Sequence, residues 1–214
     1  MMEITNAERE RFSEILASVF SPPDREMVEL VREGNIRSFF EHHLQIWGDD
    51  TGILNGFLME GDRERIFRDL KEEHDRLFTS ETGRGKISLV ESFYKPWTQD
   101  PHCSLPFATE KGLLMGDSAL HLLALYKQCG LEVEEEHQGM PDHLVMELEF
   151  LSFLYQRATD KEIKRFIEDH LDWIALLREK FKEFHSHPFY RSTLEVLLLF
   201  LHKEKERLEV ECRG

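Results

Sequence analysis

The chain has 214 residues and a net charge of −15, with 42 acidic and 27 basic side chains. Nucleic acids and anionic membrane surfaces are bound through concentrated basic patches, so this charge excludes both as expected partners and favours a cationic ligand or peptide. The length suffices for one domain with a real core. Only 12 glycines and 7 prolines are present, too few for a sandwich or barrel built on many turns.

Helical periodicity dominates the N-terminal part of the chain. Thr5 and Glu8 have the spacing of a capping box at the start of a first helix, and apolar residues then recur on one face as far as Phe20. Three further helices are expected, over residues 24–34, 35–47 and 62–78. A glycine-rich connector with a short helical turn separates the last two.

Residues 79–106 differ from the rest because they contain glycine and proline without a sustained helical period. Long irregular segments are uncommon in compact domains and are usually functional or disordered. The aromatic residues Phe93, Tyr94 and Trp97 argue against disorder, because disordered segments are poor in such side chains. We expect an ordered loop that lies over the core.

The C-terminal half is again helical. Four helices are expected: residues 108–130, a helix that opens at Pro141, residues 161–184 and residues 186–211. Thr159 and Glu162 form a second capping box ahead of the third. Pro188 lies near the start of the fourth, where a first-turn proline is favoured.

No segment predicts a strand, and no internal repeat is present. The fold class is therefore predicted as all-α, a single globular bundle of about eight to ten helices. We treat residues 1–214 as one domain. The alternative is an N-terminal subdomain, 1–78, and a C-terminal subdomain, 107–214, joined by the 79–106 loop.

The N-terminal stretch MMEITNAERERF lacks the apolar run of a signal peptide, and the most apolar segment, TLEVLLLFLH, is too short to cross a bilayer. Neither an export signal nor stable membrane insertion is expected. Cys103, Cys129 and Cys212 are widely separated and form no Cys-x-x-Cys pair. We therefore expect a reduced, cytoplasmic setting and no thiolate metal centre.

The other metal and nucleophile motifs are also missing. The His-Glu-x-x-His and Gly-x-Ser-x-Gly patterns are absent, so neither a metal site, a bound cofactor nor a catalytic nucleophile is predicted. Most histidines are expected at the surface or at helix ends: His42, His43, His121, His170, His185 and His187.

Asp142, His143 and Glu147 are the most distinctive group, at the mouth of the helix predicted from Pro141. In a purely structural role, Asp142 would lie in the first turn and cap unpaired backbone amides, and His143 and Glu147 would pair on the surface. This leaves unexplained a histidine at a helix start, where a protonated imidazole is disfavoured. A catalytic acid–base pair, a metal site and a binding contact remain the alternatives.

Several motifs, in order, resemble those of one family. The segments are HDRLF at 74–78, ESFYKPW at 91–97, a helix ending in YKQCG at 126–130, PDHLVMELEFLSFL at 141–154 and HLDW at 170–173. Together they resemble the TorD/DmsD/NarJ family of molybdoenzyme maturation chaperones, also called redox enzyme maturation proteins. The match runs from about residue 62 to residue 201.

The resemblance implies a cytoplasmic chaperone and not an enzyme. Such proteins bind the N-terminal twin-arginine signal peptide of a molybdopterin oxidoreductase catalytic subunit. They assist cofactor insertion and assembly before export. Members occur as monomers and as domain-swapped dimers, so the oligomeric state stays open. The alternatives are a hydrolase or nucleotide-binding enzyme that uses Asp142, His143 and Glu147, and a dimerising helical scaffold.

The resemblance also implies a peptide-binding site. Its residues are Leu77, Phe78, Glu91, Tyr94, Trp97, Asp142, His143 and Glu147. The three acids would pair with arginine, where a bidentate bond is strong. The apolar residues would form a wall, and His143 would donate to a peptide carbonyl. This chain departs from some members at His74, Leu89 and Val90, and Trp97 is the candidate replacement for the aromatic residue missing there.

Overall fold

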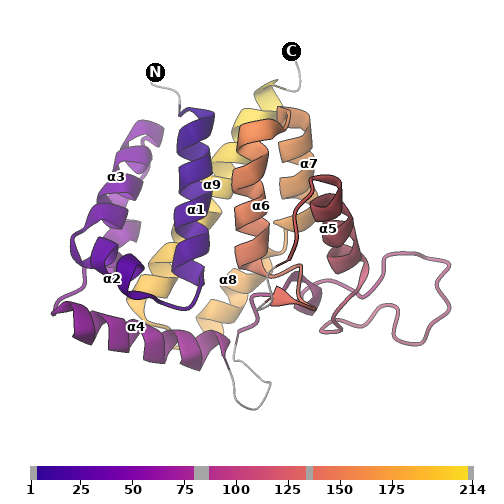
Figure 1. The fold of residues 1–214 in the computed structure, drawn as a ribbon, viewed down its shortest axis with the longest axis horizontal. Coiled ribbons are helices and arrows are strands. Elements are labelled where there is room, and N and C mark those ends of the chain that lie inside the picture. The colour runs from indigo at the N-terminus through magenta and orange to yellow at the C-terminus, as the bar shows by residue number, and fades with distance from the viewer. Residues whose placement is uncertain (1–3, 80–86, 134–136, 212–214) are drawn as a thin grey trace.

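The computed structural model describes residues 4–79, 87–133 and 137–211, and over these ranges the protein is all-α (Figure 1). The α-helices are α1 Asn6–Phe20, α2 Arg25–Arg32, α3 Asn35–Trp47, α4 Arg63–Phe78, α5 Asp117–Gln128, α6 Leu144–Arg157, α7 Asp160–His170, α8 Ile174–Glu183 and α9 Pro188–Glu211. Two 3₁₀ helices, η1 Thr51–Phe57 and η2 Glu91–Phe93, join them. The predicted fold class and helix number are confirmed.

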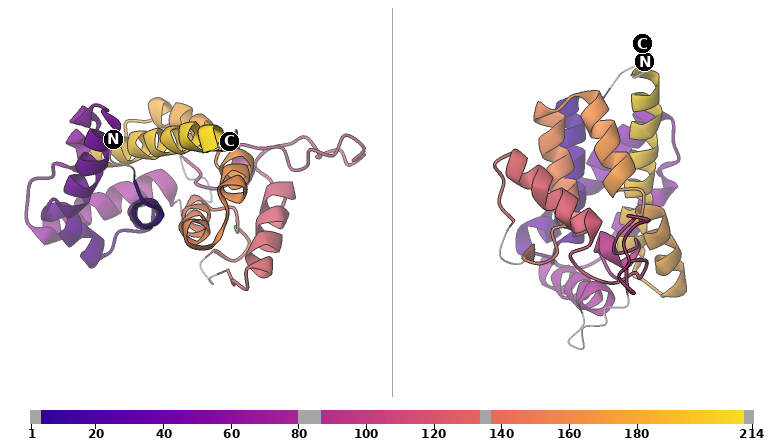
Figure 2. Two further views of the ribbon diagram at one scale, coloured as in Figure 1. Left: turned by 90° about the horizontal axis from the view of Figure 1, so that it is seen from above. Right: turned by 90° about the vertical axis from the view of Figure 1, so that its right-hand side faces the viewer.

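The helices form a bundle in which neighbours in space are often distant in sequence. The helix α1 packs against α6 and α9, and α9 also packs against η1, α7 and α8. The helix α4 crosses the lower end of this group and contacts α2 (Figures 1 and 2). In the part of the chain that the structure describes, no helix combines the length and apolar character needed to span a membrane.

Phenylalanine side chains fill much of the interior. Phe12 of α1 is 1% exposed, and its ring stacks on Phe200 of α9 with the ring centroids 4.5 Å apart. Phe40 of α3 lies 4.9 Å from Phe12 in a tilted arrangement. At Gly56 in η1, a Cβ atom would lie only 2.1 Å from the carbonyl oxygen of Pro188, so glycine lets η1 approach the start of α9. The first and last helices are thus joined through one aromatic core.

A buried carboxylate, Glu204, connects the same helices. It is 3% exposed and accepts a hydrogen bond from the Arg9 guanidinium of α1 at 2.8 Å. The hydroxyl of Tyr155 in α6 donates to it at 2.9 Å, and Arg207 pairs with it at 2.8 Å. Arg207 also contacts Asp160 at the start of α7. One acid therefore ties α1, α6 and α9 together, with α7 joined through Arg207.

The predicted helix starts are confirmed where local chemistry determines them. Thr5 and Thr159 are N-caps, and each forms the complete capping box with the glutamate three residues later. Asp62 accepts a hydrogen bond from the amide of Arg65 and so caps α4, within the predicted helix at 62–78. Pro188 is the first residue of α9.

The prediction of one helix over residues 108–130 is wrong in its first half, because α5 begins only at Asp117. A Cβ atom at Gly116 would lie 2.4 Å from the carbonyl oxygen of Trp97, so the chain here passes close to an earlier segment. The carboxylate of Asp117 accepts hydrogen bonds from the Thr98 hydroxyl and the Gln99 amide. These contacts between distant segments replace the predicted helical turns.

The prediction of one continuous helix over residues 161–184 is also wrong. The helix α7 ends at His170 and α8 starts at Ile174, with a turn between them. His170 and Trp173 flank this turn, and both are buried, at 2% and 1% exposure. The break therefore places two large polar-tipped side chains in the interior.

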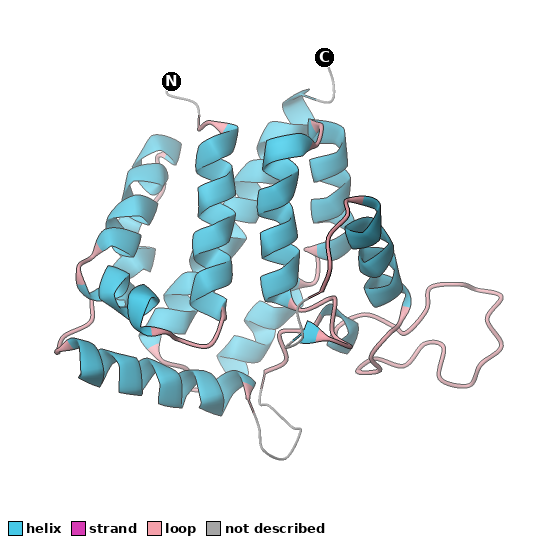
Figure 3. Cartoon of the chain, in the orientation of Figure 1, coloured by secondary structure: helices cyan, strands magenta, loops and turns pink. Residues whose placement is uncertain are grey.

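The irregular segment predicted at 79–106 is present but only partly covers the core. Residues 80–86 lie outside the described ranges. Ile87, Leu89, Val90 and Tyr94 are buried against the bundle. Beyond residue 98 the chain projects as an arm without helix (Figures 2 and 3), and Leu105 on it is 45% exposed. The prediction that the loop lies over the core is thus confirmed for residues 87–94 and wrong for the arm.

Candidate functional site

The start of α6 and the buried part of the loop are joined as a short two-stranded contact. The amide of Glu91 donates to the carbonyl oxygen of Asp142 at 2.9 Å. The amide of Leu144 donates to the carbonyl oxygen of Leu89 at 2.7 Å. The Asp142 carboxylate accepts hydrogen bonds from the Ser92 amide, at 2.9 Å, and from the Ser92 hydroxyl. The motifs around residues 91 and 142, which are far apart in sequence, therefore form one unit.

The helix predicted to open at Pro141 begins three residues later, and its cap is His143 rather than Asp142. The Nδ1 atom of His143 accepts a hydrogen bond from the Val145 amide at 3.3 Å. The Asp142 carboxylate faces the loop instead, because the amide and the hydroxyl of Ser92 both donate to it from there. The predicted capping role of Asp142 is therefore wrong.

The protonation of His143 explains a histidine at this position. Burial lowers the pKa of His143 to about 3, and the nearby imidazoles of His137 and His74 act in the same direction. The ring is neutral near pH 7, so it does not oppose the positive end of the helix dipole. Since Nδ1 is the acceptor, the proton lies on Nε2, which is free to donate.

This protonation makes stability depend on pH. The folded pKa of His143, about 3, lies below the ordinary value of 6.5, so protonation favours the unfolded chain. The neutral ring contributes fully to the free energy of unfolding above pH 6.5, and this contribution is lost as the pH falls towards 3. We expect this group to lower the free energy of unfolding by up to about 1.4 kcal/mol per pH unit in that window.

Urea unfolding at several pH values measures this effect. The variant His143→Asn keeps a side chain that caps helices well but removes the titrating ring, so its stability should fall less steeply below pH 6.5. Other buried histidines contribute equally to both proteins. Identical slopes for wild type and His143→Asn would contradict the assignment.

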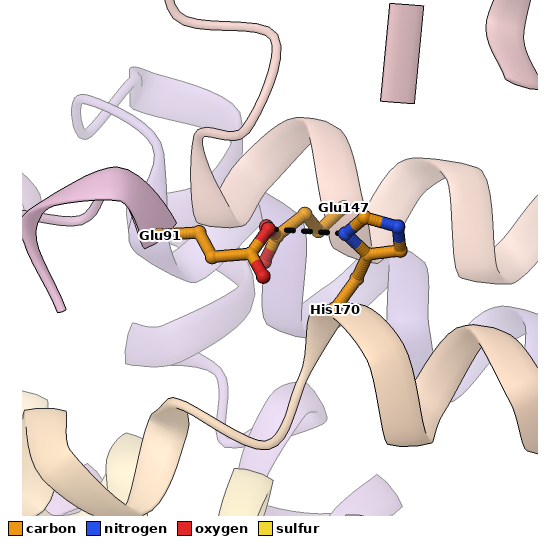
Figure 4. Close-up of side chains that lie close together, drawn as sticks. All are labelled: Glu91, Glu147 and His170. Carbon is orange, nitrogen blue, oxygen red and sulfur yellow. Dashed lines mark hydrogen bonds and ion pairs between the residues drawn. The ribbon is translucent and has the colours of Figure 1, made fainter. Parts of the chain in front are cut away.

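Behind the loop, Glu91, Glu147 and His170 meet in the interior (Figure 4). Both glutamates are 0% exposed and His170 is 2% exposed. The Glu91 carboxylate pairs with His170 Nδ1 at 3.0 Å and with Lys95 Nζ at 2.6 Å. The indole N–H of Trp173 donates to Glu147 Oε2 at 3.1 Å. Residues from the loop, α6, α7 and the turn after α7 thus share one polar cluster.

The environment separates the pKa values of the three acids. Burial acts to raise the pKa of Glu91, but the His170 and Lys95 contacts outweigh it and hold that pKa below its usual value. Burial raises the pKa of Glu147 well above its usual range, and the charge of Glu91 adds to the effect. Burial also raises the pKa of Asp142, although the Ser92 hydrogen bonds act against it.

The cluster connects with a surface groove of about 510 Å³ between α5, α6 and α7. His170 lines this groove, and its Nε2 atom lies 2.8 Å from Nδ1 of His121, an exposed residue of α5 that lines the groove as well. Phe150, Phe153 and Phe166 supply apolar wall. The groove therefore leads from solvent to the edge of the buried cluster.

The apolar members of the predicted site lie in three separate places. Leu77 is fully buried, and Phe78 is half-buried against Tyr190, with ring centroids 5.5 Å apart. Tyr94 stacks on Trp173 at 4.9 Å. Trp97 packs against Phe107 at the base of the arm. The structure thus brings Tyr94 next to Trp173 of the acid cluster, while Trp97 lies at the base of the arm.

Asp142, His143 and Glu147 do not form an open acid–base site. Asp142 and Glu147 have no exposed surface, and His143 Nδ1 is occupied by the helix cap. Only Phe78, Trp97 and His143 of the eight predicted residues are half-buried, and the other five are buried. The three half-buried side chains can therefore contact a binding partner, whereas the five buried ones cannot do so without a rearrangement.

Three members of the cluster were missed from sequence: Lys95, His170 and Trp173. His43 and His170, expected at the surface or at helix ends, are each only 2% exposed, although His170 is also the last residue of α7. The motif HLDW at 170–173 was a signal for two of the missed residues. The motif ESFYKPW at 91–97 likewise contains Lys95.

Comparison with known proteins identifies the family. The family model described as nitrate reductase delta subunit matches residues 49–191, more than half of the chain. The chaperone protein TorD of Vibrio cholerae is 27% identical over 174 residues, which cover 73% of this chain and 78% of that protein. TorD of Vibrio vulnificus is 30% identical over 115 residues, which cover 46% of this chain and about half, 54%, of that protein.

A solved structure shares the fold. The crystal structure of a putative redox enzyme maturation protein from Archaeoglobus fulgidus superposes with a TM-score of 0.52 and 22% identity, covering 94% of this chain and 93% of that one. The chain's Vibrio relatives are named as chaperones. The chain belongs to the nitrate reductase delta subunit family, which is the TorD/NarJ family of redox enzyme maturation proteins predicted from its motifs.

Proposed function

We propose that the protein is a chaperone for a molybdopterin oxidoreductase catalytic subunit. It binds the N-terminal twin-arginine signal peptide of that subunit and assists cofactor insertion and assembly before export. Membership of the family supports this proposal. The observation that carries it is the contact between two segments that resemble the family's motifs, ESFYKPW and PDHLVMELEFLSFL. The amide of Glu91 in the first is hydrogen-bonded to the carbonyl oxygen of Asp142 in the second.

The charge of the protein fits such a ligand. A twin-arginine peptide has a cationic start and an apolar middle, and a net charge of −15 attracts the cationic part at long range. Apolar side chains of a folded groove bury the second part. Electrostatic attraction then sets the association rate, and apolar contact sets the lifetime of the complex.

Within the eight predicted residues we propose a division of roles. Phe78, Trp97 and His143 retain exposed surface and contact the peptide. The neutral His143 ring donates its Nε2–H to a peptide carbonyl, since its Nδ1 is already an acceptor.

The remaining five residues support these contacts from beneath. Asp142 and Glu91 hold the loop against the start of α6 and the end of α7, and Glu147, Leu77 and Tyr94 are buried. Of the acids, Asp142 lies nearest in sequence to His143, and its Oδ1 atom has no hydrogen-bond partner. We propose it as the carboxylate that accepts an arginine when the loop opens.

Calorimetric titration with a synthetic twin-arginine signal peptide tests this proposal. Saturable binding is expected, and Phe78→Ala and His143→Ala should each weaken it by about tenfold, which corresponds to one interface contact of more than 1 kcal/mol. Changing both peptide arginines to glutamine should weaken binding to the wild type. Circular dichroism of each variant checks that its helices are intact.

The matched control is Leu58→Ala, which removes another apolar side chain that is 62% exposed and lies outside the predicted site. It should bind the peptide as the wild type does. Absence of saturable binding to the wild type would reject the proposed ligand. Equal binding by wild type, Phe78→Ala and His143→Ala would reject the proposed site.

A further inference from the structure

Glu91, Glu147 and His170 form a ligand set inside the protein. Each offers one ligand atom, and these atoms lie within 4.8 Å of one another. Their side chains converge from the loop, α6 and the end of α7 (Figure 4). None is more than 2% exposed. Two carboxylates and one imidazole are a donor set that suits zinc and related divalent ions.

Each ligand has a second polar atom besides the one it offers to an ion, here called its outer atom. Another side chain already contacts that outer atom in each case. Lys95 Nζ lies 2.6 Å from Glu91 Oε1, and the Trp173 indole donates to Glu147 Oε2 at 3.1 Å. His170 Nε2 lies 2.8 Å from His121 Nδ1. Metal ligands in proteins are typically oriented by such outer hydrogen bonds, and a histidine ligand usually donates its second N–H. The three ligands thus have the supporting contacts that a metal site requires.

Of the three inner atoms, Glu91 Oε2 and His170 Nδ1 pair with each other at 3.0 Å, but the third has no partner. Glu147 is 0% exposed, and its Oε1 atom has no hydrogen-bond partner. A buried carboxylate oxygen without a partner is costly, so such an atom points to a missing cation or proton. Among the described residues, Lys95 is the lysine that pairs with Glu91, and it also pairs with Asp172 at 2.5 Å. Its single charge is therefore divided between the cluster and an acid outside it.

We propose that this cluster binds one divalent metal ion of the zinc type. Its ligands are Glu91 Oε2, Glu147 Oε1 and His170 Nδ1, and the ion replaces the proton that His170 Nδ1 shares with Glu91 at 3.0 Å. Three protein ligands leave one position for water in a tetrahedral site. The bound ion would fasten the loop at η2 to both α6 and α7, and so rigidify the segment that contains Asp142's partner Ser92.

The structure also offers an entry path. His170 and His121 line the groove of about 510 Å³ between α5, α6 and α7, so the groove reaches from solvent to the Nε2 side of His170, at the edge of the cluster. Ligand identity, supporting contacts and access from solvent, which are three of the checkable features of a metal site, therefore fit the proposal.

Titration of the full-length protein with Co²⁺ and Zn²⁺, after removal of metals by a chelator, tests the proposal. The wild type should bind one Co²⁺ per chain with visible absorption bands typical of low coordination, and Zn²⁺ should displace it. Glu147→Gln and His170→Gln should each weaken binding by about 100-fold or more, since even loss of an outer contact costs about 10–100-fold. Zn²⁺ should raise the melting temperature of the wild type and leave that of Glu147→Gln unchanged.

The matched control is His102→Ala, which removes an exposed histidine beside Cys103 on the arm and should bind Co²⁺ as the wild type does. Equal binding by wild type, Glu147→Gln and His170→Gln would overturn the proposal, as would loss of the absorption bands in His102→Ala. Absence of stoichiometric binding to the wild type would also overturn it and would assign a shared proton to the two carboxyl groups. Melting curves without metal show which variants are folded.

Discussion

Replacement of Glu204 by alanine is expected to lower the free energy of unfolding by about 3–5 kcal/mol, the usual effect of removing one partner from a buried ion pair. The side chain is 3% exposed and accepts hydrogen bonds from Arg9 and Tyr155, at 2.8 and 2.9 Å. Its loss leaves the Arg9 guanidinium and the Tyr155 hydroxyl without their acceptor in the interior. Denaturant unfolding followed by circular dichroism measures the change.

The control for this prediction is Glu206→Ala, on the same helix. Glu206 is more than half exposed and pairs with His202 on the surface, so its removal should change stability by less than about 0.5 kcal/mol. Glu204→Gln keeps an acceptor for Tyr155 and should fall between the two. If Glu204→Ala and Glu206→Ala were equally stable, the proposed connection of α1, α6 and α9 through one acid would be wrong.

Replacement of Phe12 by alanine is expected to cost about 3–5 kcal/mol, as for other large aromatic side chains removed from a core. Phe12 is 1% exposed, and its ring contacts Phe200 and Phe40 at centroid distances of 4.5 and 4.9 Å. The cavity would lie between α1, α3 and α9, which are fixed by other contacts and collapse only partly. Thermal and denaturant unfolding report the loss.

Phe93→Ala serves as the comparison, because Phe93 is 45% exposed and loses much less burial on truncation than Phe12, which is 1% exposed. Its stability should stay within about 0.5 kcal/mol of the wild type. Equal losses for Phe12→Ala and Phe93→Ala would show that the aromatic core between the first and last helices does not carry the stability assigned to it.

Local chemistry made much of the fold predictable. The capping boxes at Thr5 and Thr159 depend on residues three apart, and the structure has both. Apolar periodicity likewise placed α4 and α9, because each helix buries one continuous face. Such features require no knowledge of the rest of the chain.

Contacts between distant segments determined the features that were missed. The late start of α5 depends on how closely Gly116 approaches the backbone of Trp97, and periodicity carries no trace of that distance. The start of α6 moved to Leu144 because Ser92 draws Asp142 away from the helix.

The same limitation applies to the candidate site. Motifs located Glu91, Asp142 and Glu147, but could not show that all three are fully buried. His170 reaches Glu91 across 79 residues of sequence, and only the folded chain brings them together. The eight residues of the predicted peptide site remain a prediction, and their burial now separates those that can contact a ligand from those that support it.

The pairing of the first helix with late ones has a consequence for synthesis. Arg9 and Glu204 are 195 residues apart, and Phe12 stacks on Phe200. As the chain leaves the ribosome, α1 emerges well before its partners α6 and α9. Contacts of such high sequence separation slow folding relative to bundles of neighbouring helices. The core is therefore expected to close only after α9 has been synthesised, and a nascent chain without α9 would expose the apolar face of α1.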